Sequence, residues 1–396
     1  MHSLDLVILA GGKGSRIKAL LNNEPKPMAI FNKKPFLEYL VQSYSKYNFE
    51  NIYILTGYKS DKIFNKFEKK YFNCVQVKCF KENKPMGTAG ALNILKKRKI
   101  NDFILLNGDT FLEVDLLKLV KSCKRNCYGS MTLVKNKSYI SNKKLVSLGL
   151  NRGNIVLKKR NGFMNGGVYF FKKKFLNFIQ KKESSLEHDL LPRLIKKNKI
   201  SGVLTKSFFI DIGTPKNFKD GKKLILKNCT RPAAFLDRDG VINYDRHSYV
   251  YKQKHFKFRP GVIRGLQLLK RKNYYIFIIT NQAGIGKGIY TTKQFYKLHN
   301  FLKEKLQRKN IYFDDIKFSP YHPQAIIKKY RKVSELRKPG NLMVKQVFEK
   351  WHIKQTESFM IGDKVTDKIC AQKSKLYFEY AEKNFYNQIK NINKKI

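Results

Sequence analysis

Acidic residues are scarce in this chain of 396 residues. It contains 29 Asp and Glu against 82 Lys and Arg, which gives a formal net charge of +53. A protein that reads nucleic acid usually concentrates such an excess in a stripe or tail beside a reading motif. Here the lysines are spread along the whole chain and no reading motif is present. We therefore expect most lysines on solvated faces, with attraction of anionic substrates as the second interpretation, and no nucleic-acid partner.

Long apolar runs and paired cysteines are missing as well. No apolar run approaches the ~18 residues that a membrane helix needs, so we expect no membrane partner. None of the six cysteines stands in a C-x-x-C pair, and the chain opens without a signal peptide. These features are typical of free thiols in a reducing compartment, and we expect a soluble, cytoplasmic protein. The length favours two or three domains over one hydrophobic core.

The chain opens with a glycine-rich loop. The apolar run LDLVILA is typical of a strand buried in a parallel sheet, and it leads directly into GGKGSR. Gly11, Gly12 and Gly14 let the backbone approach a ligand closely, and their N–H groups can face phosphate oxygens. Arg16 adds a permanent positive charge. The loop has neither the G-K-[ST] of a Walker A site nor the G-x-G-x-x-G of a dinucleotide site, so alone it indicates little.

Further motifs follow as far as residue 218, in an alternation of predicted strands and helices. They are EPKPM (24–28), KENKPMGTAGAL (81–92), DFILLNGDT (102–110), FMNGGVYFF (163–171), SLEHDLLPRL (185–194) and FFIDIGTPKNF (208–218). Such alternation predicts a mostly parallel, doubly wound sheet with ligands at the strand ends. Asp109 and Asp211 each stand at a predicted strand end, so both carboxylates can converge on one metal ion.

This order of motifs, over about residues 4–220, resembles the sugar-1-phosphate nucleotidyltransferases. In such enzymes a sugar phosphate attacks the α-phosphorus of a nucleotide and pyrophosphate leaves, so catalysis is positioning plus cancellation of negative charge. The resemblance implies that Lys26 neutralises charge at the reacting phosphates and that Asp109 and Asp211 hold Mg²⁺. It implies that the nucleoside triphosphate lies on the loop of Gly11, Gly12, Gly14, Ser15 and Arg16. The implied base and sugar contacts are Glu82, Gly87, Asn165 and Gly166.

One stretch departs from the pattern of that family. Many relatives carry a Glu-Lys pair shortly before the NGG motif, with the glutamate on a sugar hydroxyl. This chain reads IVLKKRNGF, with Lys158 or Lys159 at that place. We expect Glu187 and Asp189 to cap or orient a helix rather than to touch substrate. The mode of sugar binding therefore stays open.

A second apolar run, AAFL, ends in Asp237 and Asp239, after the short polar joint KNCTRP. Gly240 allows a bend that aims both carboxylates at one phosphate. Three motifs with further polar residues follow: YYIFIITNQAGI (274–285), LRKPG (336–340) and SFMIGDKVTD (358–367). Together these motifs resemble the phosphatases of the haloacid dehalogenase superfamily. The resemblance implies that Asp237 forms an aspartyl-phosphate and that Asp239 acts first as general acid and then as base.

The same resemblance implies the remaining roles in this half. Thr280 is implied to bind the phosphoryl group, Asn281 to take part in substrate binding, and Lys338 to offset charge on the phosphoaspartate. Mg²⁺ is bound by Asp237, Asp239 and Asp363, with Asp367 in support.

Within the superfamily, LDRDGVIN, TNQAGIGKG, YHPQ and RKPG look like the D-glycero-D-manno-heptose 1,7-bisphosphate phosphatases, over about residues 231–380. The related histidinol-phosphate phosphatases share much of this pattern, and Arg337 suits a second substrate phosphate. The closest relatives carry a loop in which three cysteines and a histidine bind zinc. Here Ser319, Tyr321, Ser334 and Leu336 occupy those places and His322 is one place off, so we predict no structural zinc. The loop must then pack through Ile326, Ile327 and Tyr330 or stay mobile.

We therefore expect an α/β protein of two doubly wound, Rossmann-like domains. A nucleotidyltransferase fold spans residues 1–228 and a haloacid dehalogenase-like fold spans residues 231–396. The two sites make sense in series: the second removes the 7-phosphate of heptose 1,7-bisphosphate, and the first joins the heptose 1-phosphate to a nucleotide. The family with this pairing makes GDP-heptose, a donor for surface glycans, so we expect GTP.

Two alternatives stay open. One is a hexose-1-phosphate nucleotidyltransferase joined to a phosphatase of histidinol phosphate or another small molecule. The other is a regulatory or scaffold protein whose first half binds nucleotide without turnover. The oligomeric state cannot be predicted.

Overall fold

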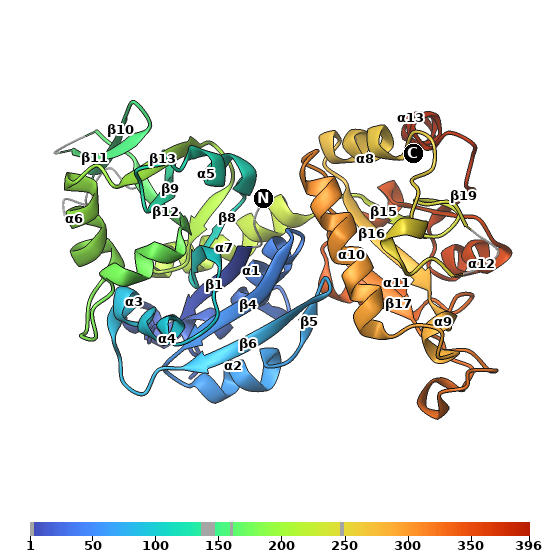
Figure 1. Ribbon diagram of the computed structural model, residues 1–396, viewed down its shortest axis with the longest axis horizontal. Coiled ribbons are helices and arrows are strands. Elements are labelled where there is room, and N and C mark those ends of the chain that lie inside the picture. Colours follow the sequence, from blue (N-terminus) through green and yellow to red (C-terminus); the bar gives the residue numbers. More distant parts are fainter. Residues whose placement is uncertain (1–3, 136–146, 159–160, 246–248) are drawn as a thin grey trace. The chain divides into compact units, whose positions relative to one another are not determined.

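The computed structural model describes residues 4–135, 147–158, 161–245 and 249–396 (Figure 1). The chain divides into two compact units. We call Met1–Ser43 with Phe49–Leu224 unit 1, and Tyr44–Asn48 with Ile225–Ile396 unit 2. No helix in the described part of the chain is both long and apolar enough to span a membrane.

Unit 1 is built on a mixed sheet of ten described strands. Its parallel centre has β1 between β4 and β7, with β6 beyond β4. β12 runs antiparallel to both β7 and β9, while β13 runs parallel to β9. In sheet order, the strands are β10 (Ser147–Asn151), β11 (Asn154–Lys158), β13 (Ile200–Thr205), β9 (Gly129–Val134), β12 (Met164–Phe171), β7 (Asp102–Asn107), β1 (Leu4–Ala10), β4 (Phe49–Thr56), β6 (Val75–Lys81) and β5 (Tyr71–Phe72).

Helices cover both faces of this sheet, which explains why β1 is apolar along almost its whole length. They include α1 (Phe36–Ser45), α2 (Ser60–Phe67), α5 (Leu116–Ser122), α6 (Leu191–Lys196) and α7 (Pro215–Cys229). The chain runs from β1 outward to β4 and β6, then crosses back to β7 on the other side of β1. Such a reversal of strand order opens a crevice at the carboxyl ends of the strands.

A small two-stranded sheet adds a second carboxylate at this edge. β8 (Thr110–Leu112) pairs with β14 (Phe209–Asp211), and Asp211 lies opposite Thr110. Because Asp109 directly precedes Thr110, this pairing brings together two aspartates that are about a hundred positions apart in the sequence.

Unit 2 is built on a five-stranded sheet in which every pairing is parallel. In sheet order, the strands are β17 (Asp315–Ser319), β16 (Tyr275–Asn281), β15 (Ala233–Leu236), β18 (Phe359–Gly362) and β19 (Tyr377–Tyr380). The main helices are α8 (Val262–Arg271), α10 (Thr292–Gln307), α11 (Leu342–Lys350), α12 (Val365–Lys373) and α13 (Phe385–Lys395). Side chains of α11 and α12 form one core with Phe235 and Phe277 of the sheet. The predicted pair of doubly wound α/β folds is confirmed.

Candidate active sites

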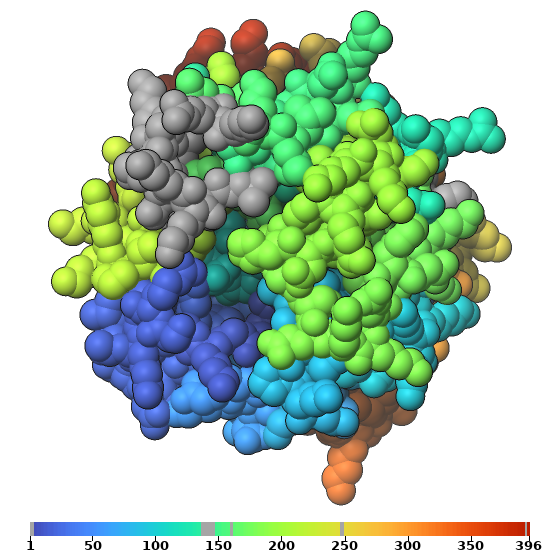
Figure 2. Space-filling model, turned by 90° about the vertical axis from the view of Figure 1, so that its left-hand side faces the viewer, coloured from blue at the N-terminus to red at the C-terminus, as the bar shows by residue number. Residues whose placement is uncertain are grey.

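A large cavity opens at the carboxyl edge of the parallel strands in unit 1. Figure 2 shows the hollow between the blue N-terminal residues and the yellow-green segment before residue 200. Its volume is 1310 Å³, above the roughly 300–1000 Å³ of most small-molecule pockets. The predicted residues that line it are Gly11, Gly12, Arg16, Lys26, Glu82, Gly87, Asp109, Asn165 and Asp211.

Gly14, Ser15 and Gly166 do not line this cavity. Gly14 has a φ of 69°, in the left-handed region that favours glycine, and a β-carbon there would lie 3.0 Å from Cβ of Lys26. Its absent side chain therefore makes room for Lys26. Contact of these three residues with nucleotide or sugar stays a prediction.

Two cations and two carboxylates meet at one point of the cavity. Lys26 is buried in a short turn between two prolines and forms an ion pair with Asp109. A β-carbon at Gly213 would lie 2.7 Å from Oδ1 of Asp211, 3.0 Å from Nζ of Lys26 and 3.2 Å from Nη2 of Arg16. Gly213 therefore has to lack a side chain for these groups to converge, and sequence reasoning missed it.

The carboxylates of this centre suit a hard cation such as Mg²⁺, which prefers oxygen ligands. Burial and the neighbouring Asp109 raise the pKa of Asp211, while Lys26 and Arg16 lower it. A raised pKa means that negative charge on Asp211 is not fully balanced by the described residues. Asp109 and Asp211 are therefore the groups in unit 1 that would hold the ion.

Glu82 lies at the other end of the glycine loop. Its Oε2 accepts a hydrogen bond from the backbone N–H of Met86 at 3.1 Å, and burial raises the pKa of the carboxyl group. A β-carbon at Gly11 would lie only 2.8 Å from Oε1. Glycine at position 11 thus leaves space for a carboxylate oxygen in the wall of the cavity.

Glu187, which we expected to cap or orient a helix, also lines the cavity. That it does not touch substrate stays a prediction. Its carboxylate accepts hydrogen bonds from Thr88 Oγ1 at 2.8 Å, Asn107 Nδ2 at 3.2 Å and the Tyr169 hydroxyl at 3.4 Å. Asp189 does bind its own segment, since it accepts the backbone N–H of Ser185 at 2.7 Å.

The stretch that departs from the family pattern lies on β11. Leu157 lines the cavity, whereas Lys158 is exposed and does not. Lys159 lies outside the described residues.

In unit 2, two carboxylates surround one lysine: Asp237 directly follows β15, and Asp367 lies in the first turn of α12. Nζ of Lys338 lies 2.9 Å from Oδ2 of Asp237 and 2.6 Å from Oδ1 of Asp367, and it donates to the carbonyl oxygen of Ile279 at 2.8 Å. Ligand atoms of Asp237, Asp363 and Asp367 all lie within 4.8 Å of one another. Asp367, expected only in support, therefore belongs to this group.

The charges of this cluster fit a divalent cation. Burial raises the pKa of Asp237 to about 7, with Asp367 and Asp239 adding to the rise and Lys338 opposing it. Burial by itself would lower the pKa of Lys338, but Asp237 and Asp367 raise it, so the ammonium stays charged. Oδ1 of Asp363 is buried and has no hydrogen-bond partner among the described residues. Asp237 and Asp367 share the ammonium of Lys338, and Asp363 lies 3.8 Å from Nζ of Lys364. Three carboxylates thus face two ammonium groups, and Mg²⁺ would balance the remaining negative charge.

Gly240 has a φ of 82°, and a β-carbon there would overlap the carboxylate of Asp363. The bend predicted at Gly240 is confirmed, and it also lets Asp363 approach. Asp239 is not in the carboxylate cluster, and its binding of metal stays a prediction.

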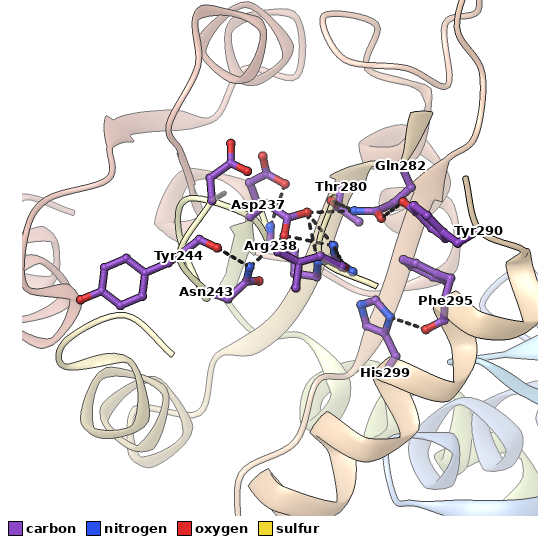
Figure 3. A network of polar contacts seen from close by, with 12 residues as sticks. Asp237, Arg238, Asn243, Tyr244, Thr280, Gln282, Tyr290, Phe295 and His299 are labelled. Carbon is purple, nitrogen blue, oxygen red and sulfur yellow. Dashed lines mark hydrogen bonds and ion pairs between the residues drawn. The ribbon is translucent and has the colours of Figure 1, made fainter. Parts of the chain in front are cut away.

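Three side-chain donors hold the carboxylate of Asp239 instead. Figure 3 labels these donors as Arg238, Asn243 and Gln282. Nη2 of Arg238 lies 2.7 Å from Oδ2, Nδ2 of Asn243 lies 2.8 Å from Oδ1, and Nε2 of Gln282 lies 3.1 Å from Oδ2. Burial alone would raise the pKa of Asp239, but Arg238 and the hydrogen bonds lower it. Arg238, only 2% exposed, also donates to the carbonyl oxygen of Val250 at 2.8 Å. Sequence reasoning missed these donors, because Arg238 reads as a spacer between two aspartates.

The other predicted residues of unit 2 lie close by. Thr280 is buried near the end of β16. Asn281 accepts the backbone N–H of Lys338 and donates to its carbonyl oxygen, each at 3.0 Å, so it positions the lysine. Arg337 is half-buried and donates to the carbonyl oxygen of Tyr321 at 3.3 Å. Substrate contacts of all three stay predictions.

The loop after β17 is held by an arginine. Nε of Arg331 donates to the carbonyl oxygen of Ala325 at 2.7 Å, and its Nη2 donates to that of Ile326 at 3.1 Å. Tyr330 lies edge-on to Tyr321 with 5.8 Å between ring centres. Of the three residues expected to pack the loop, only Tyr330 does so, since Ile326 is 71% exposed and Ile327 is 37% exposed. The alternative, a mobile loop, stays a prediction. The absence of zinc stays a prediction.

Comparison with known proteins follows the division into two units. Residues 6–139 match the family described as nucleotidyl transferase, and residues 233–393 match the family described as polynucleotide kinase 3 phosphatase. A D-glycero-beta-D-manno-heptose-1,7-bisphosphate 7-phosphatase of Rhodopseudomonas palustris is 39% identical over 137 residues, which are 35% of this chain and 76% of that protein. A D-glycero-alpha-D-manno-heptose 1-phosphate guanylyltransferase of Campylobacter jejuni is 30% identical over 226 residues, 54% of this chain and 97% of that protein.

A solved structure from Bacillus anthracis, assigned as a glucose-1-phosphate thymidylyltransferase, matches with a TM-score of 0.50 at 17% identity. The match covers 56% of this chain and 95% of that one, and at this identity it shows the fold alone. The two resemblances on which the sequence analysis depends are thus confirmed. The chain belongs to the nucleotidyl transferases through its N-terminal half and to the heptose-bisphosphate 7-phosphatases through its C-terminal half, and it is a nucleotidyltransferase joined to a phosphatase.

Proposed function

We propose that the two units catalyse consecutive steps on one heptose. Unit 2 removes the 7-phosphate of D-glycero-D-manno-heptose 1,7-bisphosphate, and unit 1 transfers GMP from GTP to the remaining 1-phosphate. The observation that carries this proposal is the agreement between relatives: one resembles each half, and both are named for a heptose phosphate. The product of the first reaction is then the substrate of the second.

The relatives differ in anomer, since the phosphatase is named for the β form and the guanylyltransferase for the α form. Two sites that work in series must accept the same anomer, because removal of the 7-phosphate leaves the configuration at carbon 1 unchanged. We propose the α form, for which the transferase relative is named. Unit 2 should then prefer the α-bisphosphate.

In unit 2, we propose that a carboxylate oxygen of Asp237 attacks the 7-phosphorus. Because its neighbours lower the pKa of Asp239, that carboxylate first takes a proton from solvent or from the substrate phosphate. The bond from phosphorus to the sugar oxygen then breaks as Asp239 gives that oxygen the proton. A water molecule then attacks the aspartyl-phosphate and loses a proton to Asp239, and inorganic phosphate leaves. Nζ of Lys338, 2.9 Å from Asp237, offsets charge throughout. Mg²⁺ held by Asp237, Asp363 and Asp367 would reduce the repulsion between the carboxylates and the substrate phosphate.

In unit 1, we propose that an oxygen of the heptose 1-phosphate attacks the α-phosphorus of the nucleotide. The bond to the β-phosphate breaks and pyrophosphate leaves, without a covalent enzyme intermediate. Lys26 and Arg16 cancel charge at the reacting phosphates, and Mg²⁺ would be held by Asp109 and Asp211. The cavity of 1310 Å³ supports direct transfer, because it exceeds the usual size for one ligand and both substrates must be bound together.

We propose that Glu82 selects guanine. A carboxylate only accepts hydrogen bonds, and guanine offers it two adjacent donors, the ring N1–H and the exocyclic amino group. Adenine and cytosine place an acceptor beside their amino group, which a carboxylate repels. Oε2 of Glu82 already accepts the N–H of Met86, and Oε1 faces the space left by Gly11.

The test supplies the full chain with α- or β-heptose 1,7-bisphosphate, Mg²⁺ and each nucleoside triphosphate in turn, and identifies the nucleotide sugar by mass. We expect GDP-heptose from the α-bisphosphate and GTP, with one phosphate and one pyrophosphate released per turnover. Faster turnover of a hexose 1-phosphate in unit 1, with no phosphate released from either bisphosphate, would favour the alternative enzyme pair. Nucleotide binding without pyrophosphate release would favour a scaffold.

A further inference from the structure

A buried glutamine touches two of the groups that the phosphatase reaction uses. Nε2 of Gln282 lies 3.1 Å from Oδ2 of Asp239 and 2.9 Å from Oγ1 of Thr280 (Figure 3). Gln282 is 1% exposed and directly precedes the short helix α9 (Ala283–Gly286), and its backbone N–H donates to the carbonyl oxygen of Ser319 at 2.8 Å. One side-chain amide thus connects the residue that would protonate the leaving oxygen with the residue that would bind the phosphoryl group.

The direction of the amide follows from the chemistry of its neighbours. In its ionised form, which the lowered pKa favours, Asp239 only accepts hydrogen bonds, so the amino group of Gln282 faces it. The amide oxygen is then left for the hydroxyl of Tyr290, which lies 2.5 Å from Oε1. In this contact the Tyr290 hydroxyl donates to the amide oxygen of Gln282. The hydrogen bond thereby prevents the amide group from rotating by 180°.

Tyr290 is itself fixed by packing. It is buried, and its ring lies parallel to that of Tyr251 at 4.9 Å between centres. A β-carbon at Gly284 would overlap the Tyr290 ring, so glycine at this position lets the tyrosine approach. Packing thus holds Tyr290, Tyr290 holds the amide of Gln282, and this amide holds Asp239 and Thr280.

The contact to Thr280 has a consequence for its hydroxyl. Because Oγ1 accepts a hydrogen bond from Gln282, the single hydroxyl proton of Thr280 is free to point away from the amide. That orientation suits donation to a phosphoryl oxygen.

We propose that Gln282 is a positioning residue of the phosphatase, held by Tyr290, which aims the carboxyl group of Asp239 at the leaving oxygen and the hydroxyl of Thr280 at the phosphoryl group. The inference rests on the proposed function, in which Asp239 gives a proton to the leaving oxygen.

Leaving-group dependence separates this role from a structural one. A sugar alkoxide needs a proton as it leaves, whereas p-nitrophenolate is stable without one. If the carboxyl group of Asp239 is misplaced, the reaction of the sugar phosphate should therefore slow far more than that of p-nitrophenyl phosphate. Loss of the Thr280 contact, or partial unfolding, should slow both equally, because the two substrates share the phosphoryl group.

The experiment measures single-turnover release of the leaving group from heptose 1,7-bisphosphate and from p-nitrophenyl phosphate by the full chain with Mg²⁺. In Gln282→Leu we expect the ratio of the sugar rate to the aryl rate to fall about 10- to 100-fold, because general acid catalysis typically contributes 10²–10⁴-fold and a misplaced group retains part of it. Tyr290→Phe, which keeps the ring but frees the amide, should lower the ratio by a smaller factor. It also serves as the second variant if Gln282→Leu does not fold.

Gln388→Leu is the matched control. Gln388 is an equally buried glutamine of unit 2, with its amide bonded to the carbonyl oxygen of Tyr380 at 2.8 Å and to the N–H of Glu382 at 3.1 Å. Its loss should leave the ratio unchanged. An unchanged ratio in both Gln282→Leu and Tyr290→Phe would overturn the proposal.

Asp239→Asn distinguishes failure of the inference from failure of the proposed function. If Asp239 is the acid, this variant lowers the ratio at least as much as Gln282→Leu, and the double variant lowers it no further. An unchanged ratio in Asp239→Asn would remove the proposed role of Asp239, and the inference with it. A lowered ratio in Asp239→Asn with an unchanged one in Gln282→Leu would overturn the inference alone.

Discussion

His299 should make the stability of unit 2 depend on pH. Its ring lies 4.1 Å from that of Phe295 on α10, and Nδ1 lies 3.0 Å from the Phe295 carbonyl oxygen, so the neutral ring carries its proton there. Nε2 is buried without a hydrogen-bond partner among the described residues. Burial, together with the positive charges of Arg238 and Lys303, lowers the pKa of His299 to about 3, although the Phe295 carbonyl and Asp239 act in the opposite direction.

The sign and size follow from the shift. In the folded chain the pKa of His299 lies below its ordinary value of 6.5. Between the two pKa values His299 is protonated in the unfolded chain but not in the folded chain, so the free energy of unfolding rises with pH. The contribution of neutral His299 to the free energy of unfolding is complete above pH 6.5 and is lost as the pH falls toward 3. At 1.36 kcal/mol per pKa unit, the loss is about 2 kcal/mol at pH 5 and about 5 kcal/mol well below pH 3.

The single tryptophan provides the assay. Trp351 lies in the core of unit 2, so its fluorescence reports the unfolding of that unit within the full chain. We expect urea unfolding to show a free energy that falls between pH 7 and pH 5 by about 2 kcal/mol more in the parent than in His299→Gln. Carboxylates that also titrate are common to both proteins and cancel in the comparison. Equal losses in the two proteins would refute the reasoning.

The other predictions concern the two reactions. Asp237→Asn should lower phosphate release by about 10³-fold or more and leave transfer to supplied heptose 1-phosphate intact, and Asp109→Ala should do the reverse. Both variants are assayed for phosphate release and for transfer to heptose 1-phosphate. Loss of both activities in either variant would contradict independent sites. Glu82→Gln should reduce the preference for GTP over ATP about 5- to 150-fold, the range for one bidentate contact to a base, measured as the ratio of kcat/KM values. An unchanged ratio would remove Glu82 from base selection. Strong chelation should stop both reactions and excess Mg²⁺ should restore them, because the proposed ligands are carboxylate oxygens; activity that survives in either half would count against a metal there. Elemental analysis should find no tightly held zinc, because the loop after β17 lacks the cysteines of a tetrahedral site; one zinc per chain would contradict this.

Much of each site could be predicted because its residues follow buried strands. The apolar runs before Asp109 and Asp237 identify strands in the sequence, and parallel strands bring their carboxyl ends to one edge. Lys26 could be predicted from its two flanking prolines, which hold a short turn. The predicted domains, residues 1–228 and 231–396, stay predictions.

Residues whose role depends on contacts far along the chain could not be predicted. Two residues far back in the sequence donate hydrogen bonds to the Glu187 carboxylate: Thr88, 99 positions away, and Asn107, 80 positions away. Gln282 has its function only because Asp239 and Tyr290 lie on either side of its amide.

The sequence by itself determined the two α/β folds, their order and the strand-end carboxylates, because hydrophobic period and strand termini are local properties. Only the tertiary structure decided that Asp367 joins Asp237 and Asp363, while Arg238, Asn243 and Gln282 hold the carboxylate of Asp239. The physical reason is that charge balance and hydrogen-bond partners depend on distances of a few ångströms between distant segments. Local patterns carry no information about such distances.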